Sequence, residues 1–274
     1  MRAIFWGTRG SISTPGPDKV RYGANTSCVS LQSGDHRLIL DAGFGIVLLA
    51  DRIMAWRRPK EQLSLPLFLS HLHWDHVIGL PFFTPIFFQK VELDIWGRSA
   101  KEVRDGAERL FTSTYSPING IQNLGATLRY HSMDGDPVSV GPFRVTHAQT
   151  RHPSATLAYR IEAEGKSFVY VSDHEAGDPA VDQGIRELAE GADVLVHDAQ
   201  WTEEEAARFT GYGHSSWAQA VEAAREASAR TLVLFHHHHR HDDDTLDEMG
   251  RLARDAAPAS LEVIVARDGL LLQP

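Results

Sequence analysis

Residues 71–76 read His71-Leu72-His73-Trp74-Asp75-His76, and they follow the apolar run Leu65-Pro66-Leu67-Phe68-Leu69-Ser70. Four side chains that can bind a metal ion thus fall within six residues, where a predicted buried strand runs into a loop. Imidazole nitrogens and carboxylate oxygens are donors that zinc and similar divalent ions accept. Solvated loop residues or core histidines are a poor explanation of three histidines and a carboxylate at this spacing. The hexapeptide therefore predicts a metal site.

Further candidate ligands lie along the chain, each close to the end of a predicted strand. His152 follows a strand-like segment, Asp173 follows the run 167–172, and His236 follows the run 231–235. Buried strands would deliver these side chains to one edge of a sheet, where a site can be assembled from several strand ends.

With HxHxDH followed by a single His, an Asp and a last His, the chain resembles the metallo-β-lactamase-fold hydrolase superfamily over nearly its whole length. Segments 7–13 (GTRGSIS), 22–28 (YGANTSC) and 40–43 (LDAG) resemble the branch that contains ribonuclease Z and related phosphodiesterases. The resemblance implies an α/β fold, namely an αββα four-layer sandwich of two mixed β-sheets flanked by helices.

The resemblance also implies a centre of two divalent metal ions. The ligands would be His71, His73 and His152 for one ion, Asp75, His76 and His236 for the other, and Asp173 between the two. Two ions roughly 3.5 to 4 Å apart would clamp a hydroxide, lower its pKa and stabilise the attacking and departing oxygens of a hydrolysis. Asp75 would thus also belong to the catalytic residues. His and Asp ligands accept zinc, manganese or iron, and we expect zinc first and manganese second.

Two positions favour hydrolysis over other chemistries of this fold. Oxygen-reducing diiron relatives resemble HxExD, whereas His73 stands at the second position of the motif here. The bridging position holds Asp173 and not the Cys of some β-lactamases. Both positions favour hydrolysis of an ester or a phosphodiester.

Two more segments supply a candidate catalytic pair. Residues 194–199 resemble the ribonuclease Z segment that carries an acidic residue, and residues 213–216 resemble its His-Ser-Thr segment. We expect Asp198 and His214 to protonate the leaving alkoxide or to steady a phosphoryl oxygen, with a gain of order 10²-fold or more. The acid in ribonuclease Z is Glu, and Asp198 is shorter. The alternative is that Asp198 orients a ligand histidine and His214 precedes a helix. Asp41 is expected to orient a ligand or fix a loop, in preference to binding a metal ion directly.

Composition favours one domain over residues 1–274, because 42% of the residues are hydrophobic and no linker, repeat or low-complexity tract divides the chain. A net charge of −9 with only five Lys argues against extended nucleic-acid binding, although the 22 Arg leave room for a local patch. The single Cys28 cannot form an internal disulfide, and residues 1–7 fit a strand, so no signal peptide is expected.

These features predict a cytoplasmic protein that acts on a small-molecule phosphodiester. No apolar stretch approaches the roughly 20 residues that span a bilayer, so no membrane association is expected. A homodimer is left open.

The expected elements alternate along the chain. We predict strands at 3–6, 27–32, 37–40, 65–70, 142–147, 156–162, 167–172, 193–197 and 231–235, and helices at 45–57, 100–111, 215–225 and 245–255. Residues 97–130 fit neither strand nor core helix throughout and are interpreted as a lid or substrate rim, or else as a surface excursion. The aromatic segment 81–88 is assigned to the core in preference to a pocket wall.

The remaining histidines are given structural roles. In the run 236–241 the first residue fits a ligand position, and residues 237–241 with the following acids are expected to line the site mouth or to cap the next helix. His36, His131, His147, His174 and His197 follow no pattern, and of these only His174 could approach the site.

The leading hypothesis is a dinuclear metal-dependent phosphodiesterase that acts on a small or cyclic nucleotide or a related phosphodiester. Alternatives on the same fold are a lactonase or thioesterase and a ribonuclease Z-like tRNA-processing endonuclease. A non-catalytic binding module is the fourth hypothesis. Such a module would be expected to lose metal ligands, and all seven are present here.

Overall fold

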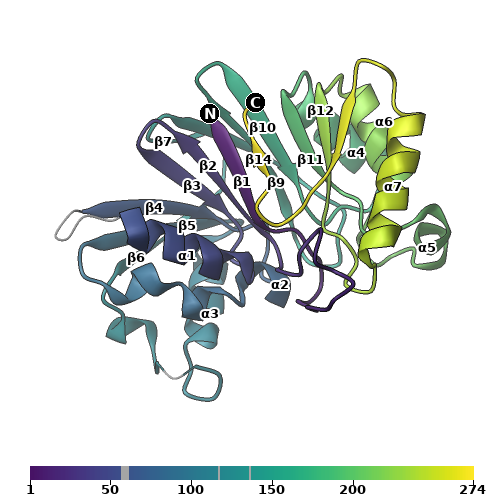
Figure 1. The fold of residues 1–274 in the computed structure, drawn as a ribbon. Coiled ribbons are helices and arrows are strands. Elements are labelled where there is room, and N and C mark those ends of the chain that lie inside the picture. Colours follow the sequence, from purple (N-terminus) through teal and green to yellow (C-terminus); the bar gives the residue numbers. More distant parts are fainter. Residues whose placement is uncertain (57–61, 117, 136) are drawn as a thin grey trace.

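Two β-sheets pack face to face in the middle of the molecule, and helices cover their outer faces (Figure 1). The computed structural model describes residues 1–56, 62–116, 118–135 and 137–274. This is the predicted αββα sandwich. The last position of the helix expected at 45–57 lies outside the described residues.

The first sheet has the strand order β14-β1-β2-β3-β4-β5-β6. Its strands are β1 (Arg2–Gly7), β2 (Cys28–Ser33), β3 (His36–Leu40), β4 (Leu63–Phe68), β5 (Val91–Gly97), β6 (Thr127–Ser132) and β14 (Leu271–Leu272). β1 pairs antiparallel with β14 and β2, whereas β3 to β6 pair in parallel, so the sheet is mixed. The pairing of β1 with β14 places the two ends of the chain side by side (Figure 1).

The second sheet has the strand order β13-β12-β11-β10-β9-β8-β7. Its strands are β7 (Val138–Val140), β8 (Phe143–Gln149), β9 (Leu157–Ala163), β10 (Lys166–Val171), β11 (Val194–Asp198), β12 (Thr231–Phe235) and β13 (Glu262–Val265). β7 to β10 form an antiparallel meander, and β10 to β13 run parallel with helices between them. Parallel pairing brings the carboxyl ends of β10, β11 and β12 to one edge, where side chains of a site can meet.

Helices cover both outer faces. α1 (Gly45–Trp56) contacts β1 and β2, and α3 (Ala100–Leu110) contacts β5 and β6. On the second sheet, α4 (Pro179–Ala189), α6 (Trp217–Glu226) and α7 (Asp243–Ala256) pack in a row. The short helices are α2 (Trp74–Val77), α5 (Glu203–Arg208) and the 3₁₀ turns Leu80–Phe82, Thr84–Phe87 and Ile121–Asn123.

Three buried apolar clusters correspond to the three interfaces between the four layers. Successive side chains of a strand point to opposite faces of the sheet, so β1 contributes to two clusters. Ala3 and Phe5 lie in the cluster between the sheets, whereas Trp6 lies in the cluster under α1. A third cluster lies under α4, α6 and α7. Burial of apolar surface in three layers provides the main stabilisation of the fold and holds the loops at the sheet edge in place.

The interpretation of residues 97–130 as neither strand nor core helix was wrong in part. α3 packs on the first sheet through buried Val103 and Ala107, and β6 is the edge strand of that sheet. β6 escaped detection because it is polar and half-exposed, and its Arg129 and His131 pair with carboxylates of the adjacent β5. An edge strand needs no alternating apolar pattern when cross-strand ion pairs support it.

The aromatic segment 81–88 divides between two roles. Phe83 and Ile86 are fully buried, as expected for core residues, whereas Phe82 is 53% exposed and lines a cavity. Across the residues that the structure describes, no helix is both long and apolar enough to cross a bilayer.

Candidate metal centre

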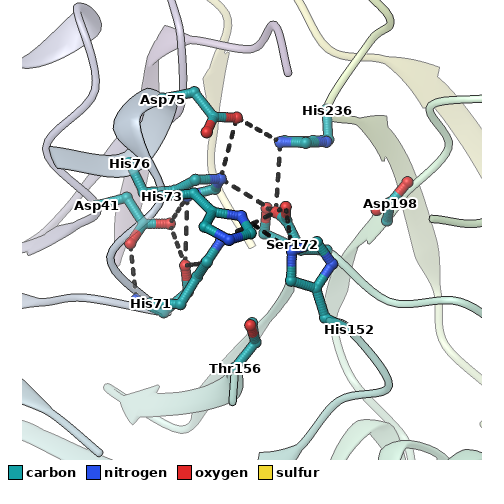
Figure 2. A network of polar contacts seen from close by, with 12 residues as sticks. Asp41, His71, His73, Asp75, His76, His152, Thr156, Ser172, Asp198 and His236 are labelled. Carbon is teal, nitrogen blue, oxygen red and sulfur yellow. Dashed lines mark hydrogen bonds and ion pairs between the residues drawn. The ribbon is translucent and has the colours of Figure 1, made fainter. Parts of the chain in front are cut away.

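Side chains from separate segments converge at one edge of the two sheets (Figure 2). The predicted strand before the motif ends at Phe68, two residues earlier than expected, so His71 and His73 lie in the loop after β4. Asp75 and His76 belong to the short helix α2, a turn that the sequence did not indicate. His152, Asp173 and His236 follow β8, β10 and β12, as predicted from the strand pattern.

The first group of candidate ligands consists of His71, His73 and His152. Nε2 of His152 lies 3.1 Å from Nδ1 of His73. The other nitrogen of His152, Nδ1, donates to the carbonyl oxygen of Gly213 at 3.1 Å. That hydrogen bond fixes the ring so that Nε2 is turned toward the other two histidines.

The second group consists of Asp75, His76, Asp173 and His236, and all four are buried. Oδ2 of Asp75 lies 3.1 Å from Nε2 of His236 and 3.3 Å from Nε2 of His76. The backbone N–H of Ser11 donates to the same Oδ2 at 2.7 Å and fixes this carboxylate. Within each group one ligand atom per residue lies within 4.8 Å of the others, as residues that share an ion must.

Asp173 lies between the two groups and offers one oxygen to each. Its Oδ1 is 3.1 Å from Nε2 of His76 and 3.3 Å from Nε2 of His236. Its Oδ2 is 3.7 Å from Nε2 of His71 and 3.8 Å from Nε2 of His152. A single carboxylate thus faces both groups.

A buried network behind the ligands holds them in place, and most of it was not predicted. Asp41, which was expected to orient a ligand, accepts from Nδ1 of His76 at 2.8 Å and from the backbone N–H and hydroxyl of Ser70 at 2.7 and 2.9 Å. The Tyr170 hydroxyl donates to it at 2.9 Å from the opposite sheet. No sequence signal marked Ser70 or Tyr170, because both look like ordinary strand residues.

The charges of the site fit a cation. Asp41, Asp75, Asp173 and Asp198 are all buried, and within the described residues none of them pairs with a Lys or Arg. Buried carboxylates without compensating charge are costly, so such a site favours a bound metal ion. The Nε2 atom of His71 is buried and lacks a hydrogen-bond partner within the described residues, as expected for a metal-ligand nitrogen.

The pKa values report the same surplus of negative charge. Burial opposes ionisation of His76, but the carboxylates of Asp173, Asp75 and Asp41 outweigh burial and raise the His76 pKa well above its ordinary value. Burial likewise opposes ionisation of Asp173, and the imidazoles around it hold its pKa well below its ordinary value. By contrast, burial lowers the pKa of His71 and keeps that ring neutral, the form in which histidine binds metals.

His214 faces the site, and Asp198 lies behind it. Nδ1 of His214 is 2.7 Å from Oδ2 of Asp198, and the His214 ring stacks on that of His236 with centroids 5.0 Å apart. Asp198 is fully buried at the end of β11 and also accepts from the backbone N–H groups of His174 and Gln200. Asp198 raises the pKa of His214 against the opposing effect of burial. This arrangement suits a positioning role for Asp198, with only His214 reaching the open space.

A hollow of about 270 Å³ opens onto the site. Its lining consists of Ser11, His73, Trp74, Asp75, Asp173, His214 and His236. The hollow thus contains members of both ligand groups and His214, so a small substrate can reach all of them together.

The other histidines lie outside the hollow. His174 does not approach the site: its ring contacts Asp182 at 3.2 Å, and burial lowers its pKa to about 3. Of the run 236–241 only the first residue lines the hollow, so the expectation of a site mouth was wrong for residues 237–241. The expectation of a helix cap was correct for Asp242, which accepts from the N–H of Thr245 at the start of α7.

A model of the β-lactamase superfamily domain matches residues 36–237, and the chain therefore belongs to this superfamily. Together with the His and Asp cluster, this membership indicates a metal-dependent hydrolase with divalent metal ions.

Individual relatives agree with the family. Ribonuclease Z of Haloarcula marismortui is 25% identical over an alignment that covers 98% of this chain and 96% of that protein. The solved structure of the metallo-β-lactamase fold protein YhfI from Bacillus subtilis has a TM-score of 0.73 with 24% identity and covers 100% of this chain and 99% of its own. A diphosphatase from the PhnP family has a TM-score of 0.71 with 16% identity, covering 100% and 97%. The two structural neighbours share the fold.

Proposed function

We propose that the protein is a dinuclear metal-dependent phosphodiesterase that cleaves a small or cyclic nucleotide or a related small phosphodiester. The observation that carries the proposal is the position of Asp173, whose two carboxylate oxygens face two separate groups of ligand side chains. One ion would be held by His71, His73 and His152, the other by Asp75, His76 and His236, and Asp173 would touch both. Zinc is the first choice for both ions.

Two bound divalent ions supply a water of lowered pKa and stabilise charge on the attacking and departing oxygens. The chain's own residues then orient the substrate and supply a proton. His214 lines the hollow, and Asp198 raises the His214 pKa against the effect of burial, which favours the protonated ring. It would protonate the leaving oxygen, while Asp198 holds the ring in place through Nδ1. The catalytic residues proposed here are therefore Asp75 and His214, with Asp198 as a positioning residue.

The relatives support phosphate-ester chemistry over carbonyl esters. Ribonuclease Z is named for the cleavage of RNA, and the PhnP-family neighbour is named as a diphosphatase. Both names concern bonds to phosphorus, so they favour a phosphodiester over a lactone or thioester. The hollow of about 270 Å³ suits a small substrate. We also propose that residues 1–274 form one domain and act in the cytoplasm.

RNA cleavage is the second candidate, because the ribonuclease Z match spans 98% of this chain. A polyanionic RNA binds through many Lys and Arg contacts to phosphate, and the net charge of −9 opposes such binding. A small phosphodiester makes no such demand on the surface. The small-substrate proposal therefore stands first.

The proposal is tested by hydrolysis of bis(p-nitrophenyl) phosphate, a cyclic nucleotide, a p-nitrophenyl ester, a lactone and a tRNA precursor, with protein whose metals have been counted. Selective cleavage of the small phosphodiesters is expected. Cleavage of only the carbonyl esters contradicts the phosphodiesterase assignment. Selective cleavage of the tRNA precursor contradicts the small-substrate assignment and favours the second candidate.

A further inference from the structure

A second, larger cavity of about 700 Å³ adjoins the candidate metal centre, and none of the proposed catalytic steps uses it. It lies between α3 and the segment that runs from the metal motif to Phe82. Its floor is apolar and buried, formed by side chains such as Leu69, Ile95 and Ala107. Its size lies within the range of small-molecule sites, which are mostly apolar with a few polar groups.

The metal motif itself forms one wall of this cavity. His71, His73 and Asp75 belong to the ligand groups, whereas the intervening Leu72 and Trp74 line the cavity. Trp74 lines both the cavity and the hollow at the metal centre, so the two spaces meet at one side chain. Trp74 is therefore the side chain past which a ligand with its phosphate in the hollow would have to extend to reach the cavity.

Aromatic side chains surround the mouth of the cavity. Trp74, Phe82 and Tyr115 are 61%, 53% and 73% exposed, and the rings of Trp74 and Tyr115 meet edge to face at 6.5 Å. Large aromatic side chains gathered at a cavity mouth mark a ligand-binding surface, since exposure there is costly without an occupant. Such rings stack well on the flat face of a base.

Arg109 places a cation at the mouth of the cavity. The other basic residues in and beside α3 each form an ion pair, Arg98 with Glu102, Lys101 with Asp105, and Arg104 with Glu108. The Arg109 guanidinium has neither an ion pair nor a hydrogen bond within the part of the chain that the structure describes, and Arg109 lines the cavity. A guanidinium can stack on a base or donate to its ring nitrogens and carbonyl oxygens. An alkyl chain has neither an aromatic face nor a hydrogen-bond acceptor for it.

We propose that this cavity binds the base of the nucleotide whose phosphodiester lies at the metal centre. The inference rests on the proposed function and assigns a substrate class to the same site. Phe82 and Tyr115 would stack on the base, and Arg109 would bind its polar edge. The α3 segment, first interpreted as a lid or rim, would thus determine which phosphodiesters the enzyme accepts.

The test uses three phosphodiesters that share a p-nitrophenyl leaving group and differ in the retained arm, which is thymidine, methyl or octyl. Phe82→Ala and Arg109→Gln change exposed positions at the mouth. Matched controls are Phe87→Ala, in the same aromatic segment, and Arg104→Gln, on the same helix, since neither residue lines the cavity. Isothermal titration with thymidine 5′-monophosphate gives a readout that does not depend on turnover.

Phe82→Ala is expected to lower kcat/KM for the thymidine ester about fivefold or more, the effect of one lost base stack, and to weaken binding of thymidine 5′-monophosphate. Arg109→Gln should act in the same direction. The methyl ester should be hydrolysed as by wild type, and both control variants should resemble wild type on all three esters.

Equal effects of Phe82→Ala and Phe87→Ala on the thymidine ester would overturn the assignment of the cavity. If the enzyme prefers the octyl ester and Phe82→Ala removes that preference, the cavity binds an alkyl chain. This result would overturn the proposal that it binds a base. Failure to hydrolyse any of the three esters would contradict the proposed function, and the titration with thymidine 5′-monophosphate then decides the cavity on its own.

Discussion

Nδ1 of His214 lies 2.7 Å from Oδ2 of Asp198, and of these two side chains only His214 reaches the hollow at the metal centre. Asp198 is fully buried, at the end of a central strand, and accepts hydrogen bonds from backbone N–H groups on both of its oxygens. The carboxylate is therefore fixed by the fold, and the imidazole is fixed by the carboxylate. Neither residue belongs to the proposed ligand set, so substitutions at this pair can separate the proposed proton transfer from metal binding.

His214→Ala should retain the bound metal and lower kcat for a phosphodiester by about 10²-fold, the usual contribution of a general acid. His147→Ala is the matched control, because His147 is a half-buried histidine of the second sheet outside both ligand groups. Metal content by elemental analysis and kcat are measured on the same samples. Loss of metal together with activity would assign His214 to the ligands, and unchanged turnover would remove its catalytic role.

Asp41→Ala should weaken zinc binding about 10- to 100-fold, although Asp41 is not among the proposed ligands. The substitution removes the acceptor of Nδ1 of His76 and leaves Ser70 and Tyr170 without their buried partner. Tyr170→Phe removes one of these hydrogen bonds and should have a smaller effect. The affinity is measured by competition with a chelating dye.

Tyr159→Phe is the control for these variants, since its hydroxyl donates to the backbone of Leu69 and does not touch Asp41. If the Asp41→Ala variant binds zinc as tightly as the Tyr159→Phe variant, Asp41 does not position His76.

Gly213→Ala should disturb the first ligand group, whereas Gly211→Ala should not. Both glycines have φ near +90°, a conformation that costs other residues about 1 to 3 kcal/mol. A Cβ at Gly213 would lie 2.1 Å from Nδ1 of His152, but a Cβ at Gly211 would meet nothing within 4 Å. Both variants should lose stability in thermal unfolding, and only Gly213→Ala should also lose zinc affinity. Equal affinities in the two variants would contradict the placement of His152.

Asp268 should make the free energy of unfolding fall as the pH rises from about 4 to 6. Burial raises its pKa from 3.8 to about 6, and its Oδ1 has no hydrogen-bond partner within the described residues. Between these values the folded state holds the proton that the unfolded state has lost, so stability declines with rising pH, by about 2 to 3 kcal/mol in all.

Asp268→Asn removes this titration. Its unfolding free energy relative to wild type should therefore increase from pH 4 to pH 6 and stay constant above that. Urea unfolding at several pH values gives the difference, and a difference that is the same at every pH would contradict the raised pKa.

The family resemblance predicted the four layers. The apolar runs predicted the strand ends that carry the candidate ligands, because buried strands leave strong local patterns. Thr231–Phe235 followed by His236 is one such pattern, and the strand has those bounds in the structure. The edge strand β6 was missed because its half-exposed polar residues carry no periodic apolar signal.

The sequence indicated which residues belong to the site better than it indicated the contacts between them. Asp41 was expected to orient a ligand, but nothing in the sequence indicated that Ser70 and Tyr170 would meet it, since these contacts join different strands and sheets. The cavity beside Trp74 likewise depends on how α3 packs, where Gly106 allows the helix to approach Leu72. Such features follow from tertiary packing, and a local pattern does not encode them.

The most direct test of the dinuclear phosphodiesterase is a titration of metal-depleted protein with zinc, in which hydrolysis of bis(p-nitrophenyl) phosphate is followed at each addition. The position of Asp173 between two ligand groups predicts that activity rises until two equivalents of zinc per chain are bound and then stays constant. Activity that is complete at one equivalent, or no hydrolysis at any zinc content, would contradict the account.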